Sequence, residues 1–272
     1  MTRETTGAPV RVVQITDTHL FRDPRAALLK LNTQFSFEKV VELMAAKEAS
    51  IDLILATGDI AQDASVEAYL RFGAAMQAFS APFYWIPGNH DRRRVMESLD
   101  QYQDAFTNLV SLANWQVIML DSSVIGEVHG HLSERELIHL EKSLQAAQGN
   151  PQIEHCMVCL HHNPIPGSAQ WMDGIGLRND KAFLAIIDRF DFVRAVVYGH
   201  IHQELDFMRN DVRYFCTPST CIQFKPKVTE FALDEMSPAY RWFDLFEDGR
   251  IESAIDRVTG YEFEVDHTSK GY

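Results

Sequence analysis

The sequence predicts an α/β fold, because apolar runs typical of buried β-strands alternate with helical patterns through most of its 272 residues. Five of these runs end in a short polar cluster rich in Asp, His or Asn. In open α/β sheets, ligands bind outside the carboxyl ends of the strands, so we expect the five clusters to converge on one site. The five runs cover residues 12–16, 53–57, 83–86, 157–160 and 195–198.

Helical patterns fill most of the intervals between these strands. The first has apolar residues at the spacing of one helix face, and Ser133 followed by Glu136 is a capping box that predicts the start of another. The apolar face of the first helix is Phe37, Val40, Val41 and Met44, and further helices are expected at 64–79, after Ser133, and at 180–190. Additional strands are expected at 116–120, 212–216, 240–246 and 251–258.

Length and composition are typical of one globular domain over residues 1–272, with residues 205–272 as a strand-rich C-terminal segment and tail. No apolar run is long enough to span a bilayer, and residues 1–9 lack the apolar stretch of a signal peptide, so we expect a cytoplasmic protein without membrane contacts. The net charge of −13 argues against nucleic-acid binding. A cytoplasmic chain keeps thiols reduced, so all four cysteines are expected to be buried free thiols: Cys156, Cys159, Cys216 and Cys221.

The polar clusters contain carboxylate, amide and imidazole groups. The absence of cysteine from the set disfavours a closed structural zinc site and suits Fe, Mn, Zn or Mg. A lone Asp-x-His or Gly-Asp is more often a cap or a turn, but accidents at five strand ends are improbable. Seven ligands are too many for one ion, whereas two ions about 3.5–4 Å apart that share a carboxylate would use them all. The candidate ligands are Asp17, His19, Asp59, Asn89, His161, His200 and His202.

The order of these motifs resembles the calcineurin-like metallophosphoesterases. The motifs D-x-H, G-D, G-N-H-D, H-H-x-P and G-H-x-H follow one another, and the resemblance extends from residue 11 to the mid-220s. It implies a four-layer sandwich of two mixed β-sheets flanked by helices. Within this superfamily, four stretches are most similar to the bacterial class III 3′,5′-cyclic AMP phosphodiesterases: 168–173, 176–179, 199–206 and 217–226.

The resemblance also implies a role for each residue. Asp59 would bridge the two metals; Asp17, His19 and His202 would complete the first site, and Asn89, His161 and His200 the second. His90 would be the catalytic residue that contacts the phosphoryl oxygens and protonates the leaving group. On physical grounds rather than by resemblance, Trp171 is able to stack on a base and Arg178 to pair with a phosphate, although an exposed Trp can equally anchor a loop. The substrate-binding set is therefore His19, Asp59, Asn89, His90, His202, Trp171 and Arg178.

We therefore expect a hydrolase that converts 3′,5′-cyclic AMP to 5′-AMP by attack of a metal-bound hydroxide. Its cofactors would be two divalent ions, Fe²⁺ or Mn²⁺ in preference to Zn²⁺ or Mg²⁺. Its partner would be a small cyclic nucleotide, with the protein a monomer or a homodimer. The alternatives are a broader phosphodiesterase, such as a glycerophosphodiesterase, and a non-catalytic scaffold, which the complete set of ligands disfavours.

Several nearby residues are expected to play supporting roles. Consecutive strand residues point to opposite faces, so His161 is the expected ligand and His162 a supporting pocket residue. Asp63 is expected to cap a helix rather than orient a catalytic imidazole. At most one of the three arginines at 92–94 is expected to reach a bound anion. The remaining histidines are expected to be structural or solvent-exposed: His129, His131, His139, His155 and His267.

Overall fold

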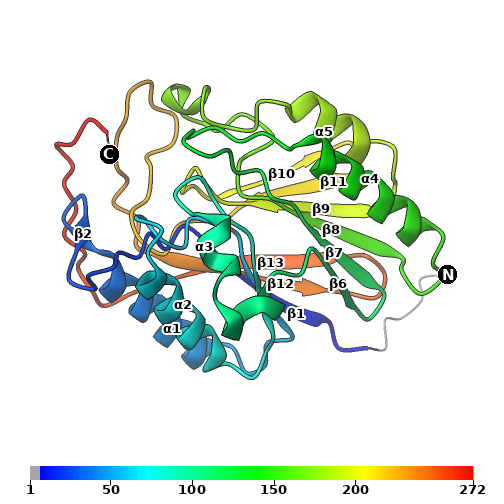
Figure 1. The fold of residues 1–272 in the computed structure, drawn as a ribbon, viewed down its shortest axis with the longest axis horizontal. Coiled ribbons are helices and arrows are strands. Elements are labelled where there is room, and N and C mark those ends of the chain that lie inside the picture. Colours follow the sequence, from blue (N-terminus) through cyan, green and yellow to red (C-terminus); the bar gives the residue numbers. More distant parts are fainter. Residues whose placement is uncertain (1–6, 272) are drawn as a thin grey trace.

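The structure is a computed structural model that describes residues 7–271. Residues 1–6, which belong to the segment expected not to be a signal peptide, and Tyr272 lie outside the described residues. Two mixed β-sheets face each other, and helices cover their outer sides (Figure 1). The first sheet contains, in order, β13 (Ile251–Arg257), β12 (Ala239–Leu245), β1 (Val10–Ile15), β4 (Leu53–Ala56) and β5 (Phe83–Trp85). The second contains β10 (Leu205–Arg209), β11 (Val212–Cys216), β9 (Val193–Tyr198), β8 (His155–Cys159), β7 (Trp115–Met119) and β6 (Leu109–Leu112).

The helices lie on the two outer faces. In Figure 1, α1 and α2 lie together on the side of the first sheet, whereas α4 and α5 lie beyond the second. The helices are α1 (Thr33–Lys47), α2 (Val66–Gln77), α3 (Arg93–Glu97), α4 (Glu134–Gln148) and α5 (Asp180–Ile187), with 3₁₀ turns η1 (Asp100–Ala105) and η2 (Gln170–Met172) and a small hairpin of β2 (Ala27–Leu28) and β3 (Leu31–Asn32). Within residues 7–271, the helices are too short or too polar to cross a membrane.

Alternating side chains of the central strands build three separate cores. In β1, Val12 points between the two sheets, whereas Val13 and Ile15 point toward α1 and α2. In β8, Met157 joins the core between the sheets, and Val158 joins the core under α4 and α5. A strand that is buried on both faces is apolar at most positions, which explains the nearly continuous apolar runs in the sequence, interrupted in β1 by the buried Gln14. The predicted four-layer α/β sandwich is confirmed.

The strands that carry the polar clusters run parallel within each sheet. In the first sheet β1 pairs in parallel with β4, and β4 with β5; in the second sheet β8 pairs in parallel with β7 and β9. Their carboxyl ends therefore lie at a common edge. The C-terminal segment after residue 204 adds β10 and β11 to the second sheet and β12 and β13 to the first, so it is woven into both.

Several local expectations are corrected. Asp63 is not the helix cap: α2 begins after Ser65, and the Asp63 carboxylate instead accepts hydrogen bonds from the backbone N–H groups of Arg22 and Ser65. The Ser133 hydroxyl does accept a bond from the Glu136 N–H, as expected, but the Glu136 carboxylate accepts from the N–H of Asp121 rather than closing the capping box. The helix expected at 180–190 is α5, which ends at Ile187, three residues earlier than expected. The four cysteines are buried and free, as expected.

Candidate active site

The five polar clusters lie together between the carboxyl edges of the two sheets. Asp17 and His19 follow β1, Asp59 follows β4, and Asn89 and His90 follow β5, all in the first sheet. The second sheet contributes three imidazoles: His161 follows β8, and His200 and His202 follow β9. All seven candidate ligands are therefore presented to one centre by strands of both sheets.

Distances between side-chain atoms show how closely the donors are grouped. Asp59 Oδ2 lies 3.2 Å from His161 Nε2 and 3.8 Å from His19 Nε2, so its carboxylate faces two different imidazoles. Asp17 Oδ1 lies 3.3 Å from His202 Nε2, and Asn89 Oδ1 lies 3.3 Å from His161 Nε2. Asp59 thus occupies the junction between a group containing His19 and a group containing His161, which is the place a bridging carboxylate requires.

The backbone turns sharply at most of these positions. The φ angles are positive at Asp17 (54°), His19 (46°), Asp59 (51°), His200 (69°) and His202 (44°). For a residue with a side chain, the left-handed conformation costs about 1–2 kcal/mol. Five such residues in one site indicate that interactions elsewhere in the fold offset the conformational free energy of these turns, as is common at functional sites.

Two glycines of the sequence motifs allow close approach of the ligand-bearing turns. A Cβ atom on Gly88 would lie 2.2 Å from Asp59 Oδ1, and one on Gly199 would lie 2.2 Å from Thr16 Oγ1 and 2.4 Å from Asp17 Oδ2. Both distances are far below van der Waals contact. Any side chain at either position would therefore displace one of the two carboxylates.

In each candidate imidazole, one ring nitrogen faces an oxygen acceptor of the protein. Nδ1 of His19 lies 2.6 Å from Gln62 Oε1, Nδ1 of His161 lies 2.8 Å from the Thr57 carbonyl oxygen, and Nδ1 of His202 lies 2.9 Å from the Ile222 carbonyl oxygen. His200 uses the opposite nitrogen: its Nε2, rather than its Nδ1, lies 3.0 Å from a carbonyl oxygen, that of Ile175. A carbonyl acceptor places the proton on the nitrogen that faces it, so the opposite nitrogen is left with the lone pair that a metal needs.

Burial and charge shape the ionisation of this centre. Burial lowers the pKa of His19 and of His200 to about 3, so both are neutral. Burial also opposes protonation of His161, but the Asp59 and Asp17 carboxylates raise its pKa to about 9. Burial tends to raise the pKa values of both carboxyl groups, yet neighbouring imidazoles lower them, so both carboxylates are charged. Two buried carboxylates that face several imidazoles form a donor set that fits divalent metal ions, and a bound cation would take the place of the proton on His161.

Asp91, the last residue of the G-N-H-D motif, is a supporting residue whose role the sequence did not indicate. Its buried carboxylate accepts hydrogen bonds from the N–H groups of Gly88, Ile60 and Ala61 and from the Tyr69 hydroxyl, at 2.9–3.1 Å. Asp91 therefore holds the loop that carries Asp59 against the loop that carries Asn89. Burial and the Asp59 carboxylate raise the pKa of Asp91 to about 6, although the three backbone donors lower it.

We expect Asp91→Ala to lower the free energy of unfolding by about 2–5 kcal/mol, because four donors would be left without their acceptor. Urea denaturation followed by circular dichroism measures this change. Asp104→Ala removes an exposed carboxyl group and should change stability by less than about 0.5 kcal/mol. Equal stability of the two variants would show that Asp91 does not hold the loops together.

His162 fits the supporting role expected for it. It is buried, its Nδ1 lies 2.8 Å from Ser122 Oγ, and its Nε2 lies 3.2 Å from the Val128 carbonyl oxygen. One nitrogen of this ring also lies within 4.8 Å of nitrogens of His161 and His200. Both ring nitrogens of His162 face groups outside the candidate ligand set, whereas Nε2 of His161 faces Asp59 and Asn89. The contacts therefore favour His161 as the ligand and His162 as the residue that fixes the 121–131 loop.

A cavity of about 570 Å³ opens beside the metal residues and is bordered by His90 and His200. Trp171 belongs to its wall and lies edge-on to Phe224 and Phe231, with ring centroids 5.1 Å apart in both pairs. The other residues in the lining are Val128, Ile175, Thr229, Glu230, Lys270 and Gly271. An apolar cavity next to a polar centre is typical of a ligand site.

Arg178 lies apart from this cavity. Its side chain is exposed and lines a different hollow together with Asn163 and Asp180, among others. The structure therefore places Trp171 beside the candidate metal ligands but does not place Arg178 there. The two residues are seven positions apart in the sequence, yet they line different hollows.

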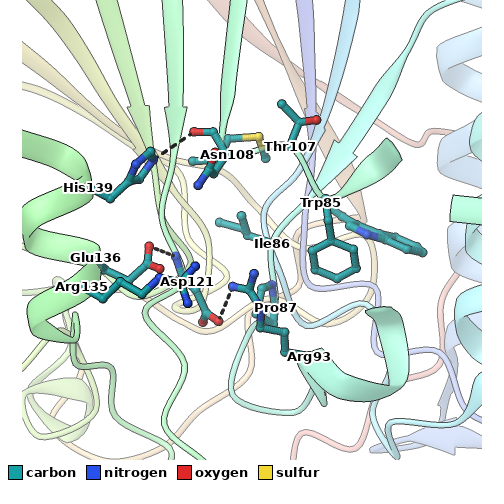
Figure 2. A pocket seen from close by; sticks show the side chains of 12 residues that line it. Trp85, Ile86, Pro87, Arg93, Thr107, Asn108, Asp121, Arg135, Glu136 and His139 are labelled. Carbon is teal, nitrogen blue, oxygen red and sulfur yellow. Dashed lines mark hydrogen bonds and ion pairs between the residues drawn. The ribbon is translucent and has the colours of Figure 1, made fainter. Parts of the chain in front are cut away.

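Two of the three arginines after His90, Arg92 and Arg93, are engaged in structural contacts. Figure 2 shows another hollow, in which Arg93 faces Asp121. Its volume is about 210 Å³, and the Arg93–Asp121 ion pair measures 3.1 Å. Arg93 also pairs with Glu97 at 2.7 Å, and Arg92 donates to the carbonyl oxygen of Asp91. Because no candidate metal ligand is among the residues that line this hollow, it is a space behind the loop after β5 rather than part of the metal site.

Comparisons with known proteins agree with this geometry. The sequence matches the calcineurin-like phosphoesterase family over residues 10–204, more than half of the chain. The chain belongs to this family. The matched region contains every candidate metal ligand and His90, whereas six residues of the large cavity lie beyond it: Phe224, Thr229, Glu230, Phe231, Lys270 and Gly271.

Curated relatives are similar over nearly the full length. The 3′,5′-cyclic adenosine monophosphate phosphodiesterase CpdA of Pseudomonas aeruginosa is 42% identical over 98% of this chain and 97% of the relative. CpdA of Escherichia coli K12 is 41% identical, over 97% of this chain and 96% of the relative. The 3′,5′-cyclic-nucleotide phosphodiesterase alr5338 of Nostoc is 34% identical, over 92% and 93%.

Solved structures share the fold. A dimetal phosphatase from Danio rerio superposes with a TM-score of 0.61 at 16% identity, covering 93% of this chain and 100% of that chain. A purple acid phosphatase from yellow lupin gives a TM-score of 0.65 at 12% identity, covering 96% of this chain and 53% of that one. At these identities the similarity establishes the architecture alone.

Proposed function

We propose that this protein hydrolyses 3′,5′-cyclic AMP to 5′-AMP at a two-metal centre. The observation that carries the proposal is the convergence of seven oxygen and nitrogen donors around Asp59, whose carboxylate faces both His19 and His161. Curated relatives that are named as cyclic AMP phosphodiesterases and cover nearly the whole chain support the choice of substrate.

Asp59 belongs to both proposed metal sites, and the other six ligands form two groups of three. Asp17, His19 and His202 would hold one ion with Asp59, and Asn89, His161 and His200 would hold the other. The mixture of carboxylate, amide and imidazole suits Fe²⁺ or Mn²⁺ and also accommodates Zn²⁺ or Mg²⁺. When bound, two such ions supply positive charge to the phosphoryl group and make hydroxide available near neutral pH.

The protein contributes charge balance and orientation to the reaction. Two carboxylates, those of Asp17 and Asp59, reduce a metal charge of +4 to about +2, and a hydroxide reduces it to about +1, which complements a phosphodiester monoanion. The backbone N–H of His90 donates to Asp59 Oδ1 at 2.9 Å, and the His90 ring lies edge-on to His19 with centroids 5.0 Å apart. His90 thus contacts two proposed metal ligands and borders the cavity, which supports its proposed role as the donor of a proton to the departing 3′ oxygen.

The cavity would hold the nucleoside. Trp171, Phe224 and Phe231 offer aromatic faces and edges to a purine base, and His90 and His200 border the end where the phosphate would lie. In-line attack requires the ribose to be held in one orientation, which such a wall can impose. Arg178 is left out of the proposed substrate site because it lines a different hollow.

We expect metal-loaded protein to convert cyclic AMP to 5′-AMP and to act poorly on p-nitrophenyl phosphate, because a dianionic monoester matches a site charge of about +1 less well than a monoanionic diester. Chromatographic identification of the nucleotide product is the measurement, with bis-p-nitrophenyl phosphate and glycerophosphocholine assayed in parallel. Hydrolysis of the other diesters without 5′-AMP formation would reject cyclic AMP in favour of a broader phosphodiesterase. Inactivity on every substrate with each of Fe, Mn, Zn and Mg would favour a scaffold.

The cellular compartment, the single-domain organisation and the choice between monomer and homodimer stay predictions from the sequence. A small cyclic nucleotide as the partner follows from the proposed activity and from the size of the cavity.

A further inference from the structure

The wall of the substrate cavity is completed by segments that lie beyond the region matched by the family. Residues 261–271, here called the C-terminal strap, follow β13 and contribute Lys270 and Gly271 to this wall. In Figure 1 the strap runs past β2 and ends beside the loop that precedes β12. That loop contributes Phe224 and Phe231 to the cavity wall. The metal residues thus belong to the shared family region, whereas much of the cavity wall is specific to the C-terminal part of the chain.

Several contacts fix the path of the strap. The Tyr261 ring lies edge-on to Phe35 with centroids 5.9 Å apart, and Phe263 packs against two of the three hydrophobic cores. Farther along, the N–H of Asp266 donates to the carbonyl oxygen of Leu29 at 2.9 Å. The Asp266 carboxylate then accepts bonds from the N–H and hydroxyl groups of Thr268, which closes a turn just before Lys270. The strap is therefore anchored along its length and delivers Lys270 to a defined place.

Lys270 is the one lysine or arginine among the residues that line the cavity, and Glu230 is the one carboxylate. Among the described residues, neither of them forms an ion pair within 4.0 Å. The chain carries a net charge of −13, which repels an anionic substrate. Because Lys270 pairs with no carboxylate of residues 7–271, its ammonium group offsets this repulsion at the cavity wall.

We propose that Lys270 is a substrate-binding residue that contacts a non-bridging oxygen of the phosphodiester. The inference rests on the proposed phosphodiesterase activity but not on the choice of cyclic AMP, because any phosphodiester monoanion offers the same oxygens. An ammonium group donates to a charged oxygen with little directional demand, which suits a contact from an anchored but exposed strap.

This contact exists before, during and after the reaction, because the substrate, the transition state and the product all carry charged phosphoryl oxygens. Binding that is equal in the ground state and the transition state changes KM and leaves kcat nearly unaltered. The 5′-AMP product carries one more negative charge than the cyclic substrate, so inhibition by 5′-AMP depends on Lys270 at least as strongly. These two signatures separate a substrate contact from a merely structural role.

The test compares Lys270→Met with Lys225→Met, which removes the same charge from an exposed residue of the neighbouring loop that does not line the cavity. We expect Lys270→Met to raise KM roughly three- to tenfold for both cyclic AMP and bis-p-nitrophenyl phosphate, with kcat changed less than about twofold. The inhibition constant for 5′-AMP should rise by a similar or larger factor. Lys270→Arg should restore near-normal KM values, and Lys225→Met should behave like the unaltered protein.

Three results would overturn the inference. Unchanged KM values for both diesters would show that Lys270 does not reach the substrate. A lower kcat at normal KM would indicate that the strap acts on the fold of the site, and equal effects of both lysine variants would indicate a general charge effect. If the unaltered protein hydrolyses only the synthetic diester, the cyclic AMP assignment fails, while the KM comparison on that diester still decides the role of Lys270.

Discussion

Asp59→Ala is expected to abolish turnover and metal binding together. The Asp59 carboxylate faces His161 at 3.2 Å and His19 at 3.8 Å, so it is the ligand placed to connect the two proposed metal sites. Without it, each ion would lose an anionic ligand, and the centre would lose the group that holds the two ions at a fixed separation. The measurement is metal content by elemental analysis of the purified protein, alongside its rate of diester hydrolysis.

Asp59→Asn provides a graded comparison, because it keeps an oxygen donor but removes the charge. We expect it to bind at least one ion less tightly and to be far slower than the unaltered protein. Asp104→Ala, which removes an exposed carboxyl group in η1, should keep both metals and full activity. If Asp59→Ala retained two tightly bound ions and near-normal rates, Asp59 would not be the bridging ligand.

The arrangement of the site could be predicted because each cluster is local to a strand end. Asp17, Asp59 and His161 each follow a largely apolar run within three residues, so the strand and its polar end are visible together in the sequence. Parallel strands then bring these ends to one edge, whatever the length of chain between them. The fold class followed from the same runs, since strands buried on both faces are apolar at most positions.

The partners that orient the imidazoles could not be predicted in the same way. Three of the four rings are held by backbone carbonyl groups, those of Thr57, Ile175 and Ile222, and every residue type has such a carbonyl. The sequence also gave no sign that Asp91 collects four donors from two loops, because its role depends on how those loops pack.

Exposed or short elements were predicted least well. β6 and β10 are short strands at the edges of the second sheet, where an alternating or mixed pattern gives little signal. Asp63 was assigned to a helix cap because Asp is a common cap, but Ser65 occupies that position. Lys270 reaches the cavity only through the tertiary path of the strap, which local sequence pattern does not encode.

His90→Ala is expected to lower turnover roughly 10²–10⁴-fold while both metals remain bound, because removal of a positioned proton donor typically has an effect of this size. The side chain of His90 borders the cavity and its ring lies 5.0 Å from that of His19, measured between centroids. Its backbone N–H, which supports Asp59 at 2.9 Å, is retained in the alanine variant. The change therefore removes the ring without removing a proposed metal ligand or the hydrogen bond to one.

Single-turnover rates and elemental analysis on the same preparation separate the two effects. His131→Ala is the matched control, because His131 is exposed and is outside the residues that line the large cavity. A leaving group that needs no proton gives a second comparison: p-nitrophenolate is a much weaker base than the ribose 3′ alkoxide, so hydrolysis of bis-p-nitrophenyl phosphate should fall less than hydrolysis of cyclic AMP. Equal losses on both substrates would indicate that His90 stabilises phosphoryl charge rather than donating the proton, and loss of both metals would place His90 among the ligands.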